Sequence, residues 1–465
     1  MIPALARLRS GTQGSPYEGG LWVVGGAVRD ALIAGQDVEN QLTGDIDITL
    51  AGDALSCAKW LHEQGISSIY PVLYERFGTA MVMVEGVQIE FATARRDNYE
   101  FDSRKPTVSP ATLIEDARRR DFTCNTLMWN LHSGEVLDPL AMGLDDLRHK
   151  VLRTPTAPET CFSEDPLRLL RAVRFAHQLG FNYSEETRLA ITKMAPRLKI
   201  ISKERIMVEV SKMLTGPDPA GAMRDLMALG VLAEFWPEFS AGIGMNQGPY
   251  HKLDVWGHTL AVLDAAPRGD LLLSLACLFH DVGKPRCRTV DSDGRIRFFG
   301  HEEVGAKMAG QMLRDLKFSH DLAGDVSKLV AMHMRLNQAS QMGAPAGRRF
   351  VRDAGPLLDT LLKLVRADRM GHLVHPPGPE LDAIEASLRA IQHRAAQKPL
   401  ESPLDGKQIM KLLDIAPGPV LREAKAALLH EVLEGHFEPD DTQRAQDFIR
   451  QWYNQRTQRV EGNNL

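Results

Sequence analysis

The feature that most constrains the fold is a single change of hydrophobic periodicity along the 465 residues. Between residues 21 and 150, short apolar alternations such as "DIDITLA", "TAMVMV" and "VQIEFATA" are separated by turns, and Glu85 with Gly86 forms a two-residue hairpin connection. From about residue 160, apolar residues recur at helical spacing and the runs stop at glycine, as in "DPLRLLRAVRFAHQLG". We therefore predict an α+β domain followed by an all-helical remainder.

Proline and glycine interrupt the helical periods at three places and predict the limits of the segments. The chain is about three times the length of an average domain, so several cores are expected. The first residues lack the apolar stretch of a signal peptide and predict a disordered arm. We expect the following division: an arm over 1–20, the α+β domain over 21–155, and helical segments over 156–215, 216–378 and 379–465.

The composition is that of an ordinary globular protein, with 44% hydrophobic and 25% charged residues and a net charge of −5. No apolar run approaches the roughly 18 residues of a membrane span, so a membrane role is not expected. The five cysteines form no C-x-x-C pair, which favours reduced thiols and a cytoplasmic location. The net charge does not exclude a local basic groove for nucleic acid, and the oligomeric state is left open.

Two aspartates mark a candidate metal site in the first domain. In the segment "DIDITL", alternation along a strand sends Asp45, Asp47 and Thr49 to one face and the apolar residues to the core. In "VQIEFATA" the same alternation presents Glu90 on the polar face. Converging carboxylates repel one another unless a cation neutralises them, and hard oxygen ligands suit Mg²⁺. We predict a two-metal site in which Glu90 completes the pair of aspartates.

A glycine pair precedes these acids. The segment "VVGGAVRD" reads as a strand, a tight turn at Gly25 and Gly26, and a helix whose first amides and Arg29 face outward. Such a turn holds phosphate against backbone N–H groups. Together with the aspartates downstream, it describes a site at which a nucleoside triphosphate meets metal ions.

These ordered motifs resemble the class II tRNA nucleotidyltransferases, or CCA-adding enzymes, and the related bacterial poly(A) polymerases. The resemblance runs from about residue 21 to the C-terminal segment. It implies a polymerase-β-like nucleotidyltransferase domain over 21–155, a helical neck over 156–215 that recognises the nucleotide base, and a tRNA-binding segment over 379–465. One departure is visible: about five additional residues within "GQDVENQLTG" lengthen the loop before the aspartates, which we expect to be tolerated.

The resemblance also implies roles for individual residues. The R-R-D-x-x-x-N element, which contacts the triphosphate and sugar, corresponds to Arg119, Arg120, Asp121 and Asn125. The E-D-x-x-R element places Asp165 and Arg168 against the base, on one face of a helix, and is extended by Arg171 and Arg174. Two further matches are a loose D-x-x-G-x-x-D-L pattern at Asp138, Gly143, Asp146 and Leu147, and a helix with Glu204, Arg205 and Glu209.

Basic residues are concentrated between Arg168 and Arg205, and this concentration fits a polynucleotide partner independently of the family. A solvated helical face is the alternative interpretation. The residues are Arg168, Arg171, Arg174, Arg188, Lys193, Arg197, Lys199, Lys203 and Arg205.

Histidines and aspartates form an ordered set in the helical half, in numbers that suit one or two transition metal ions. The set is His258, His280, Asp281, His301, His333 and Asp368. It resembles the HD phosphohydrolase superfamily, and the resemblance implies an HD domain over 216–378 that hydrolyses phosphate esters of nucleotides or tRNA ends. HD domains also persist without activity.

We therefore predict a template-independent enzyme that adds CCA to the 3′ end of tRNA from CTP and ATP with Mg²⁺, together with a divalent transition metal at the HD site. One alternative is a narrower product of the same chemistry, either CC addition or poly(A) addition. The sequence "DSRKP" with Asp102, Arg104, Lys105 and Pro106 resembles the loop of the complete enzymes and favours full CCA addition. Another alternative is a nucleotide-binding regulator in which the HD domain is the functional domain and the first domain only binds. The presence of both Asp45 and Asp47 disfavours this alternative.

Overall fold

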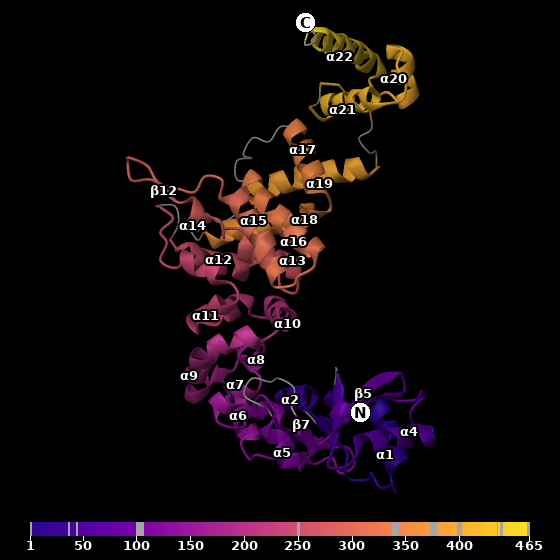
Figure 1. Ribbon diagram of the computed structural model, residues 1–465, viewed down its shortest axis with the longest axis vertical. Helices are drawn as coiled ribbons and strands as arrows, with labels where there is room; N and C mark the ends of the chain where they lie inside the picture. Colours follow the sequence, from indigo (N-terminus) through magenta and orange to yellow (C-terminus); the bar gives the residue numbers. More distant parts are fainter. Residues whose placement is uncertain are drawn as a thin grey trace. The chain divides into compact units, whose positions relative to one another are not determined.

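In the computed structural model the chain forms two compact units, residues 1–241 with 315–318 and residues 242–314 with 319–465 (Figure 1). The units divide at 241–242 rather than at the predicted 215–216, because α11 (Pro219–Ala228) packs against α8 (Leu167–Leu179) and α10 (Lys203–Leu214). The structure describes residues 2–35, 38–42, 45–98, 107–248, 252–336, 344–372, 379–397, 402–434, 436–437 and 440–462.

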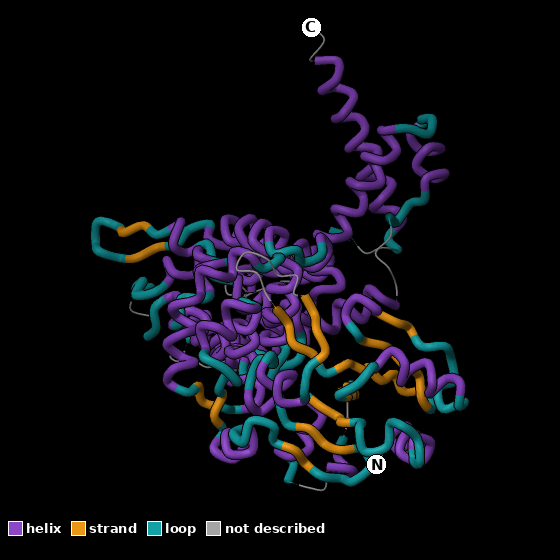
Figure 2. The backbone as a smooth tube through the Cα atoms, turned by 60° about the horizontal axis from the view of Figure 1, so that its bottom comes forward, coloured by secondary structure: helices purple, strands orange, loops and turns teal. Residues whose placement is uncertain are grey.

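The first unit contains a seven-stranded mixed sheet in the order β3-β4-β5-β2-β1-β8-β9 (Figure 2). Strand β2 is parallel to β5 and antiparallel to β1. The predicted hairpin joins β4 to β5, with Glu85 and Gly86 both at positive φ, as a type I′ turn requires. The strands are β1 (Trp22–Val24), β2 (Ile46–Leu50), β3 (Val72–Tyr74), β4 (Thr79–Val84), β5 (Val87–Thr93), β8 (Met128–Asn130) and β9 (Val136–Leu137).

Helices α1 (Pro3–Thr12), α2 (Gly26–Ile33) and α4 (Ala54–Glu63) share one hydrophobic core with the apolar residues of the sheet. A smaller cluster forms where Val24 and Met128 meet Ala117 of α5 (Leu113–Arg118). The remaining elements of this region are α3 (Val38–Gln41), β6 (Arg95–Asn98), β7 (Thr107–Pro110) and α6 (Gly143–His149).

The N-terminal segment differs from the prediction of a disordered arm, which is wrong for residues 3–12. These residues form α1, in which Leu5 and Leu8 are fully buried. Arg9 donates from Nε to the carbonyl of Leu131 at 2.6 Å, and Thr12 Oγ1 lies 2.9 Å from His132 Nε2. The apolar residues at helical spacing were the signal of this packed helix.

The rest of the first unit is helical, as the periodicity predicted. His177 on α8 bridges two carboxylates of α11, with Nδ1 2.7 Å from the N-cap residue Asp218 and Nε2 3.0 Å from Asp225. Tyr183 donates its hydroxyl to the same Asp225. The elements are α7 (Pro158–Glu164), α8, α9 (Glu185–Met194), α10, α11 and the two-stranded ladder of β10 (Val151–Leu152) and β11 (Asn182–Tyr183).

The second unit is a helical assembly in which α12, α13 and α18 pack against one another and α16 packs on α13. A small hairpin of β12 (Thr289–Val290) and β13 (Ile296–Arg297) extends away from the helices of this unit (Figures 1 and 2). The helices are α12 (Val255–Ala265), α13 (Leu271–Phe279), α14 (Lys284–Cys287), α15 (His301–Asp315), α16 (His320–Met332), α17 (Ala344–Ala354), α18 (Leu358–Gly371) and α19 (Pro379–Gln397).

The last three helices have a hydrophobic core of their own, to which Leu404, Ile409, Leu428 and Ile449 contribute. They are α20 (Gly406–Leu413), α21 (Pro419–Glu434) and α22 (Thr442–Gly462).

Among the described residues, no helix combines the length and apolar character needed to cross a bilayer. All five cysteines are free thiols.

Candidate functional site

Three acidic side chains gather where β2 lies beside β5. Asp47 is opposite Glu90 in the parallel register of these strands, and Asp45 immediately precedes β2. The side chains of Asp47 and Glu90 are exposed, whereas their apolar neighbours in the strands are buried. Thr49 is buried and donates to the carbonyl of Ala92 at 3.3 Å. The structure thus brings Asp47 and Glu90 together on adjacent strands, with Asp45 two residues before Asp47 and with Thr49 buried.

Asp47 and Glu90 border a cavity of about 220 Å³ whose wall also contains Arg95, Arg119 and Arg120. Desolvation together with the negative charges of Glu90 and Asp45 raises the pKa of Asp47 to about 6, against the opposing charge of Arg120. A divalent cation would relieve this repulsion, and carboxylate oxygens are the ligands that Mg²⁺ prefers. The residues present therefore fit a magnesium site.

Gly25 brings the backbone close to the acids. Its φ of 80° and ψ of −143° lie in a region that side chains rarely adopt, and it caps the N-terminus of α2. A Cβ at this position would lie 3.7 Å from Asp47 Oδ2 and 4.0 Å from Arg120 Nη1. The predicted turn at Gly25 and Gly26 therefore borders the acidic site directly.

Arg119 and Arg120 are held at the cavity by Asp116, a residue that sequence reasoning missed. Its buried carboxylate accepts from Arg119 Nη2 at 2.6 Å and from Arg120 Nη2 at 2.9 Å. Burial alone would raise the pKa of Asp116, but the two guanidinium groups hold it below its usual value. The signal was present in "EDARRR", because an acid three and four residues before two arginines faces both of them on a helix.

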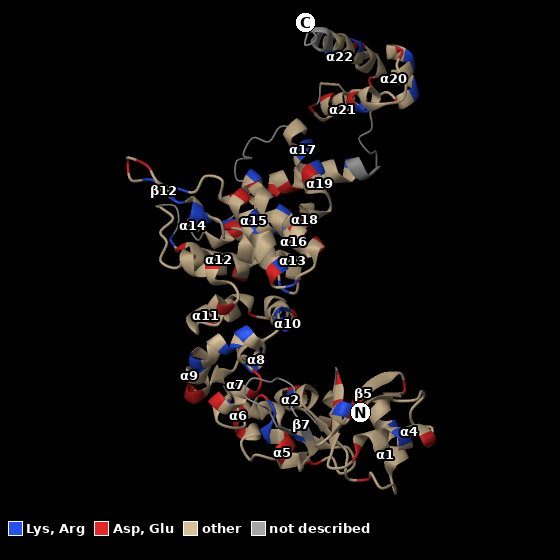
Figure 3. Ribbon diagram, in the orientation of Figure 1, with Lys and Arg blue, Asp and Glu red and all other residues tan. Residues whose placement is uncertain are grey.

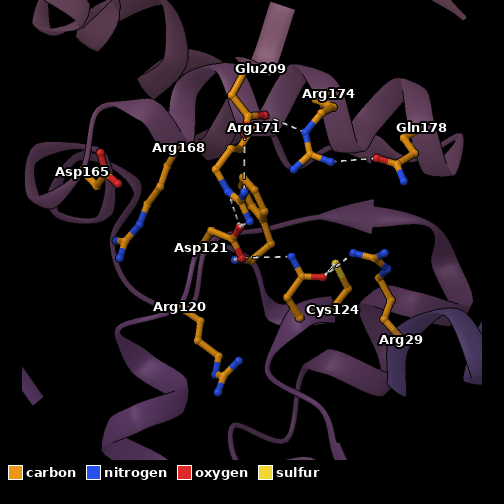
Figure 4. Close-up of polar contacts among 12 residues, drawn as sticks. Arg29, Arg120, Asp121, Cys124, Asp165, Arg168, Arg171, Arg174, Gln178 and Glu209 are labelled. Carbon is orange, nitrogen blue, oxygen red and sulfur yellow. Dashed lines mark hydrogen bonds and ion pairs between the residues drawn. The ribbon is translucent and has the colours of Figure 1, made fainter. Parts of the chain in front are cut away.

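Asp121 is the centre of a buried polar network (Figure 4). Its Oδ1 accepts from Asn125 Nδ2 at 2.9 Å, and its Oδ2 accepts from Arg171 Nη2 at 2.6 Å. Glu209 on α10 continues the network, pairing with Arg174 at 2.6 Å and lying 3.7 Å from Arg171. These predicted nucleotide-binding residues are assembled in one place, where Asp121 and Asn125 support the arginines.

Arg29 does not face outward, so that prediction is wrong. The residue is only 3% exposed, because its guanidinium lies 5.0 Å from the ring centroid of Phe175 on α8. Nη1 donates to Asn125 Oδ1 at 2.7 Å, and Nε donates to Asp30 at 2.8 Å. Arg29 therefore joins α2 to the buried network instead of presenting a charge to solvent.

Asp165 and Arg168 do not share a helical face, contrary to prediction. Asp165 follows the end of α7 and accepts from Arg205 Nη2 at 2.9 Å. Arg168 lies in the first turn of α8 and donates to Glu164 at 3.0 Å, and also to the carbonyls of Cys161 and Arg119. Figure 4 shows the two side chains pointing in different directions. Pro166 separates them and starts the new helix, which breaks the predicted spacing.

The basic run is largely paired, although Figure 3 shows Lys and Arg along α8, α9 and α10. Arg168 and Arg174 are buried. Lys193 lies 3.5 Å from Glu159, and Lys199 lies 3.6 Å from Glu234. Most of these basic residues therefore have acidic partners within the protein, and the expectation of a polynucleotide partner for the run stays a prediction.

The six predicted ligands of the HD site come together in the second unit, and all are buried. They form two groups, in each of which the ligand atoms lie within 4.8 Å of one another. The first group is His258, His280 and Asp368, and the second is Asp281, His301 and His333. The residues come from different helices, so their convergence depends on the tertiary fold.

The imidazole rings are oriented for metal binding. Nδ1 of His280, His301 and His333 donates to the backbone carbonyl three residues earlier, at 2.7, 2.8 and 2.6 Å. This bond leaves the lone pair of Nε2 toward the cluster. Nε2 of His333 is buried and makes no hydrogen bond with any described residue. A buried nitrogen of this kind fits a metal ion as its missing partner.

The charges at the HD site favour ionised carboxylates and a neutral His333, whereas at His280 burial opposes but Asp281 and Asp368 produce a raised pKa. Burial alone would raise the pKa of Asp281, but His280 and Lys284 hold it well below its usual value. Lys284 Nζ lies 2.6 Å from Asp281 Oδ2 and 2.7 Å from Gln247 Oε1. Burial lowers the pKa of His333 to about 4, which keeps that imidazole neutral. Ionised carboxylates and neutral imidazoles are the forms that bind divalent metals.

His372 is a further residue at this site that sequence reasoning missed. Its Nε2 lies 3.3 Å from Asp368 Oδ1, and its ring centroid is 4.8 Å from that of His258. Its position four residues after Asp368 on one helix was the available signal.

Comparison with known proteins matches three family models to successive segments of the chain. Residues 21–153 match the family model of the "Poly A polymerase head domain". Residues 180–243 match the "Probable RNA and SrmB- binding site of polymerase A", and residues 250–371 match the "HD domain". The solved structure of the Bacillus stearothermophilus CCA-adding enzyme in complex with CTP has the same fold, with a TM-score of 0.66 and 23% identity over 99% of this chain and 100% of that chain.

Two curated relatives identify the family. The A-adding tRNA nucleotidyltransferase of Deinococcus radiodurans is 34% identical, over 94% of this chain and 96% of the relative. The CC-adding tRNA nucleotidyltransferase of Thermus thermophilus is 35% identical, over 75% of this chain and 80% of the relative. The fold is that of a nucleotidyltransferase. The chain belongs to the tRNA nucleotidyltransferase family.

Proposed function

We propose that the protein adds C, C and A to the 3′ end of tRNA from CTP and ATP, in the cytoplasm and without a nucleic-acid template. The observation that carries the proposal is that Asp47 and Glu90 lie side by side on β2 and β5, next to Gly25 and Arg120. Two carboxylates, a glycine turn and a guanidinium group thus lie in one place. Such a group can hold both the metal ions and the triphosphate of a nucleotide.

In this proposal Asp45 and Asp47 hold Mg²⁺ and Glu90 completes the site. The bound metal supplies a lowered pKa for the tRNA 3′-hydroxyl and neutralises charge on the triphosphate. Arg119 and Arg120 contribute fixed positive charge at the cavity wall because Asp116 orients them. The 3′-oxygen attacks the α-phosphorus, the bond to the β-phosphate oxygen breaks, and pyrophosphate leaves.

The test is extension of four versions of one tRNA, ending before the CCA, after C, after CC and after CCA. Each is incubated with Mg²⁺ and labelled CTP or ATP. A full CCA-adding enzyme adds CMP to the first two and AMP to the third, and leaves the last unchanged. Absence of incorporation on all four substrates would contradict the proposal.

The same assay separates the alternatives. A CC-adding enzyme stops before AMP, an A-adding enzyme extends only the tRNA that ends in CC, and a poly(A) polymerase continues on the completed end. The relatives from Deinococcus radiodurans and Thermus thermophilus are named for the A-adding and CC-adding activities, so both outcomes are specific alternatives. The loop that favours full CCA addition, with Asp102 to Pro106, lies outside the described residues.

Nucleotide choice is proposed to depend on Asp165 and Arg168. A carboxylate that accepts from an exocyclic amine and a guanidinium that donates to a ring nitrogen would suit cytosine and adenine and reject uracil and guanine. Because each side chain now has other partners, this role requires Asp165 to leave Arg205 and Arg168 to leave Glu164. Asp165→Ala should lose discrimination against UTP and GTP, and Arg168→Ala should weaken use of CTP and ATP. Unchanged preference in both variants would place selection at Arg171 or Arg174.

A second function is proposed for the HD site, namely metal-dependent hydrolysis of a phosphate ester. The buried Nε2 of His333 supports it, because the nitrogen is aimed at the carboxylate of Asp281 from 3.9 Å. Water would add to phosphorus, the ester bond would break, and the leaving alcohol would take a proton. The test is release of phosphate from nucleoside monophosphates and of monoesters from 2′,3′-cyclic nucleotides, with Mg²⁺, Mn²⁺, Co²⁺ or Ni²⁺. A regulator would bind these nucleotides without turning them over.

A further inference from the structure

The hairpin of β12 and β13 leads to the wall of the HD cavity. It lies in the chain between Lys284 and His301, two residues of the buried cluster. The cavity has a volume of about 310 Å³, which is at the lower end of the range for small-molecule sites. Ile296, Arg297, Phe298 and Phe299 all line it, together with residues of the metal cluster. The hairpin therefore supplies one side of the space above the cluster.

Phe298 fastens this side of the cavity to the metal-binding residues. Its carbonyl accepts from His301 Nδ1 at 2.8 Å, the bond that orients this imidazole. Its ring centroid lies 5.5 Å from Lys284 Nζ, within the range of a cation–π contact. The segment that carries Phe299 is thus anchored at its base and has a defined position beside the cluster.

Phe299 presents an aromatic ring to solvent at the edge of the cavity. The residue is 77% exposed. The Arg297 guanidinium carbon lies 5.7 Å from its ring centroid, and Arg297 Nε donates to Asp291 at 2.9 Å. A ring and a guanidinium group thus stand together beside a cluster that suits phosphate chemistry.

We infer that Phe299 is the platform on which the base of a nucleotide stacks while its phosphate lies at the HD cluster. The inference rests on the proposed hydrolytic function and makes nucleoside phosphates, rather than simple phosphate esters, the substrate class. Every base has a π-face, so a stacking platform selects for a base without selecting one sequence. Arg297 lies where its N–H groups can donate to the ribose or to a second phosphate oxygen.

The experiment compares two phosphate monoesters, adenosine 2′-monophosphate and glycerol 2-phosphate, of which only the first has a base. Hydrolysis with Mn²⁺ is measured for the full chain carrying Asp45→Ala and Asp47→Ala, so that nucleotide binding at the acidic site does not interfere. In that background, Phe299→Ala should raise KM for the nucleotide about 10- to 100-fold, the value of one base–aromatic stack. Hydrolysis of glycerol 2-phosphate should be unchanged. Phe299→Trp should retain nucleotide preference.

Val290→Ala is the matched control, because Val290 is 51% exposed on the same hairpin and does not line the cavity. It should leave both substrates unaffected. Equal losses on the two substrates in Phe299→Ala, or none on either, would overturn the platform while leaving hydrolysis established. If the chain carrying Asp45→Ala and Asp47→Ala does not hydrolyse the nucleotide, it is tested by equilibrium dialysis of adenosine 2′-monophosphate in Mn²⁺. Weaker binding by Phe299→Ala then supports the platform, although the hydrolytic proposal has failed. Absence of binding when Phe299 is intact overturns both the platform and the hydrolytic proposal.

Discussion

The two candidate metal centres use similar ligands in opposite surroundings. In the first unit, Asp47 and Glu90 are exposed on the polar face of a sheet, and the register of two strands places them. In the second unit all six ligands are buried, and three imidazoles are held by hydrogen bonds from Nδ1 to the backbone. The first centre is open to solvent and the second is preorganised inside a core.

This difference predicts how readily each centre exchanges its metal ion. An open pair of carboxylates keeps Mg²⁺ largely hydrated and gains affinity from the phosphates of a bound nucleotide. A buried set of oriented imidazoles and carboxylates holds a transition metal without substrate. We therefore expect the first metal to exchange with solvent in each turnover and the second to survive dialysis.

The largest expected effect is the loss of nucleotide addition in the double variant Asp45→Ala, Asp47→Ala. Metal-assisted charge stabilisation is worth several kcal/mol, so the rate of CMP incorporation should fall by at least about a thousandfold. Binding of tRNA and hydrolysis at the HD site should persist, because other residues carry them. Glu63→Ala, which removes an exposed acid from α4, is the control. Extension near the parent rate would show that the acids are misassigned.

The reciprocal variant is His280→Ala with Asp281→Ala. It should abolish phosphate-ester hydrolysis and leave CCA addition intact, since the second centre lies in another unit. It should also abolish a rise in the melting temperature with Mn²⁺, expected to be several degrees in the wild type because a ligand that binds only the folded state stabilises it. Differential scanning calorimetry measures this rise, and an equal rise in the variant would place the metal elsewhere.

A smaller effect is expected for Asp116→Asn, which tests whether the open centre has any preorganised part. The neutral amide cannot hold both Arg119 and Arg120, and hydrogen bonds to charged groups are worth about 1.5–3 kcal/mol, so kcat/KM for CTP should fall about 10- to 100-fold. Asp145→Asn, at an exposed position on α6, should leave the rate unchanged. If both variants behave alike, Asp116 does not position the arginines.

The smallest effect concerns the cluster of His177, Asp218 and Asp225. Here a protonated histidine, rather than a metal ion, neutralises two carboxylates. Burial would lower the pKa of His177, but its bonds to Asp225 and Asp218 raise it. A raised pKa means that the stabilisation is complete below the unfolded value near 6.5 and disappears as the pH rises through the folded value. The urea midpoint should therefore fall by an amount equivalent to about 1 kcal/mol between pH 6 and pH 9, and a metal chelator should not change the size of this fall.

His177→Gln should remove most of this pH dependence. The two aspartates have lowered pKa values. Burial opposes both shifts, which the Gly221 N–H and His177 produce at Asp218 and which His177 and Tyr183 produce at Asp225. Their own contribution is therefore present at neutral pH and is lost only as the pH falls into the acid range. A midpoint that rises with pH in the wild type would contradict the assignment.

The sequence predicted features that depend on local periodicity. Alternation along two short strands placed Asp47 and Glu90 on one face, and the six HD ligands could be named because they form an ordered set. It did not predict features that depend on packing between distant segments. Arg29 is buried because Phe175, far along the chain, covers it. The spacing of three residues would place Asp165 beside Arg168 only if both residues lay in one continuous helix. In the structure α7 ends before Asp165, and α8 begins after Pro166.

The packing of α1 bears on the order in which the head domain folds. Leu5 and Leu8 are buried in a core that includes Trp129, and Arg9 bonds to the carbonyl of Leu131. Other partners of α1 lie nearer, such as Glu39 and β4, but the ribosome must release more than a hundred residues after α1 before Trp129 and Leu131 are available. Contacts so distant in sequence form slowly because loop closure costs entropy. During synthesis, the apolar side of α1 is thus completely covered only after the strand at residues 128–130 has emerged.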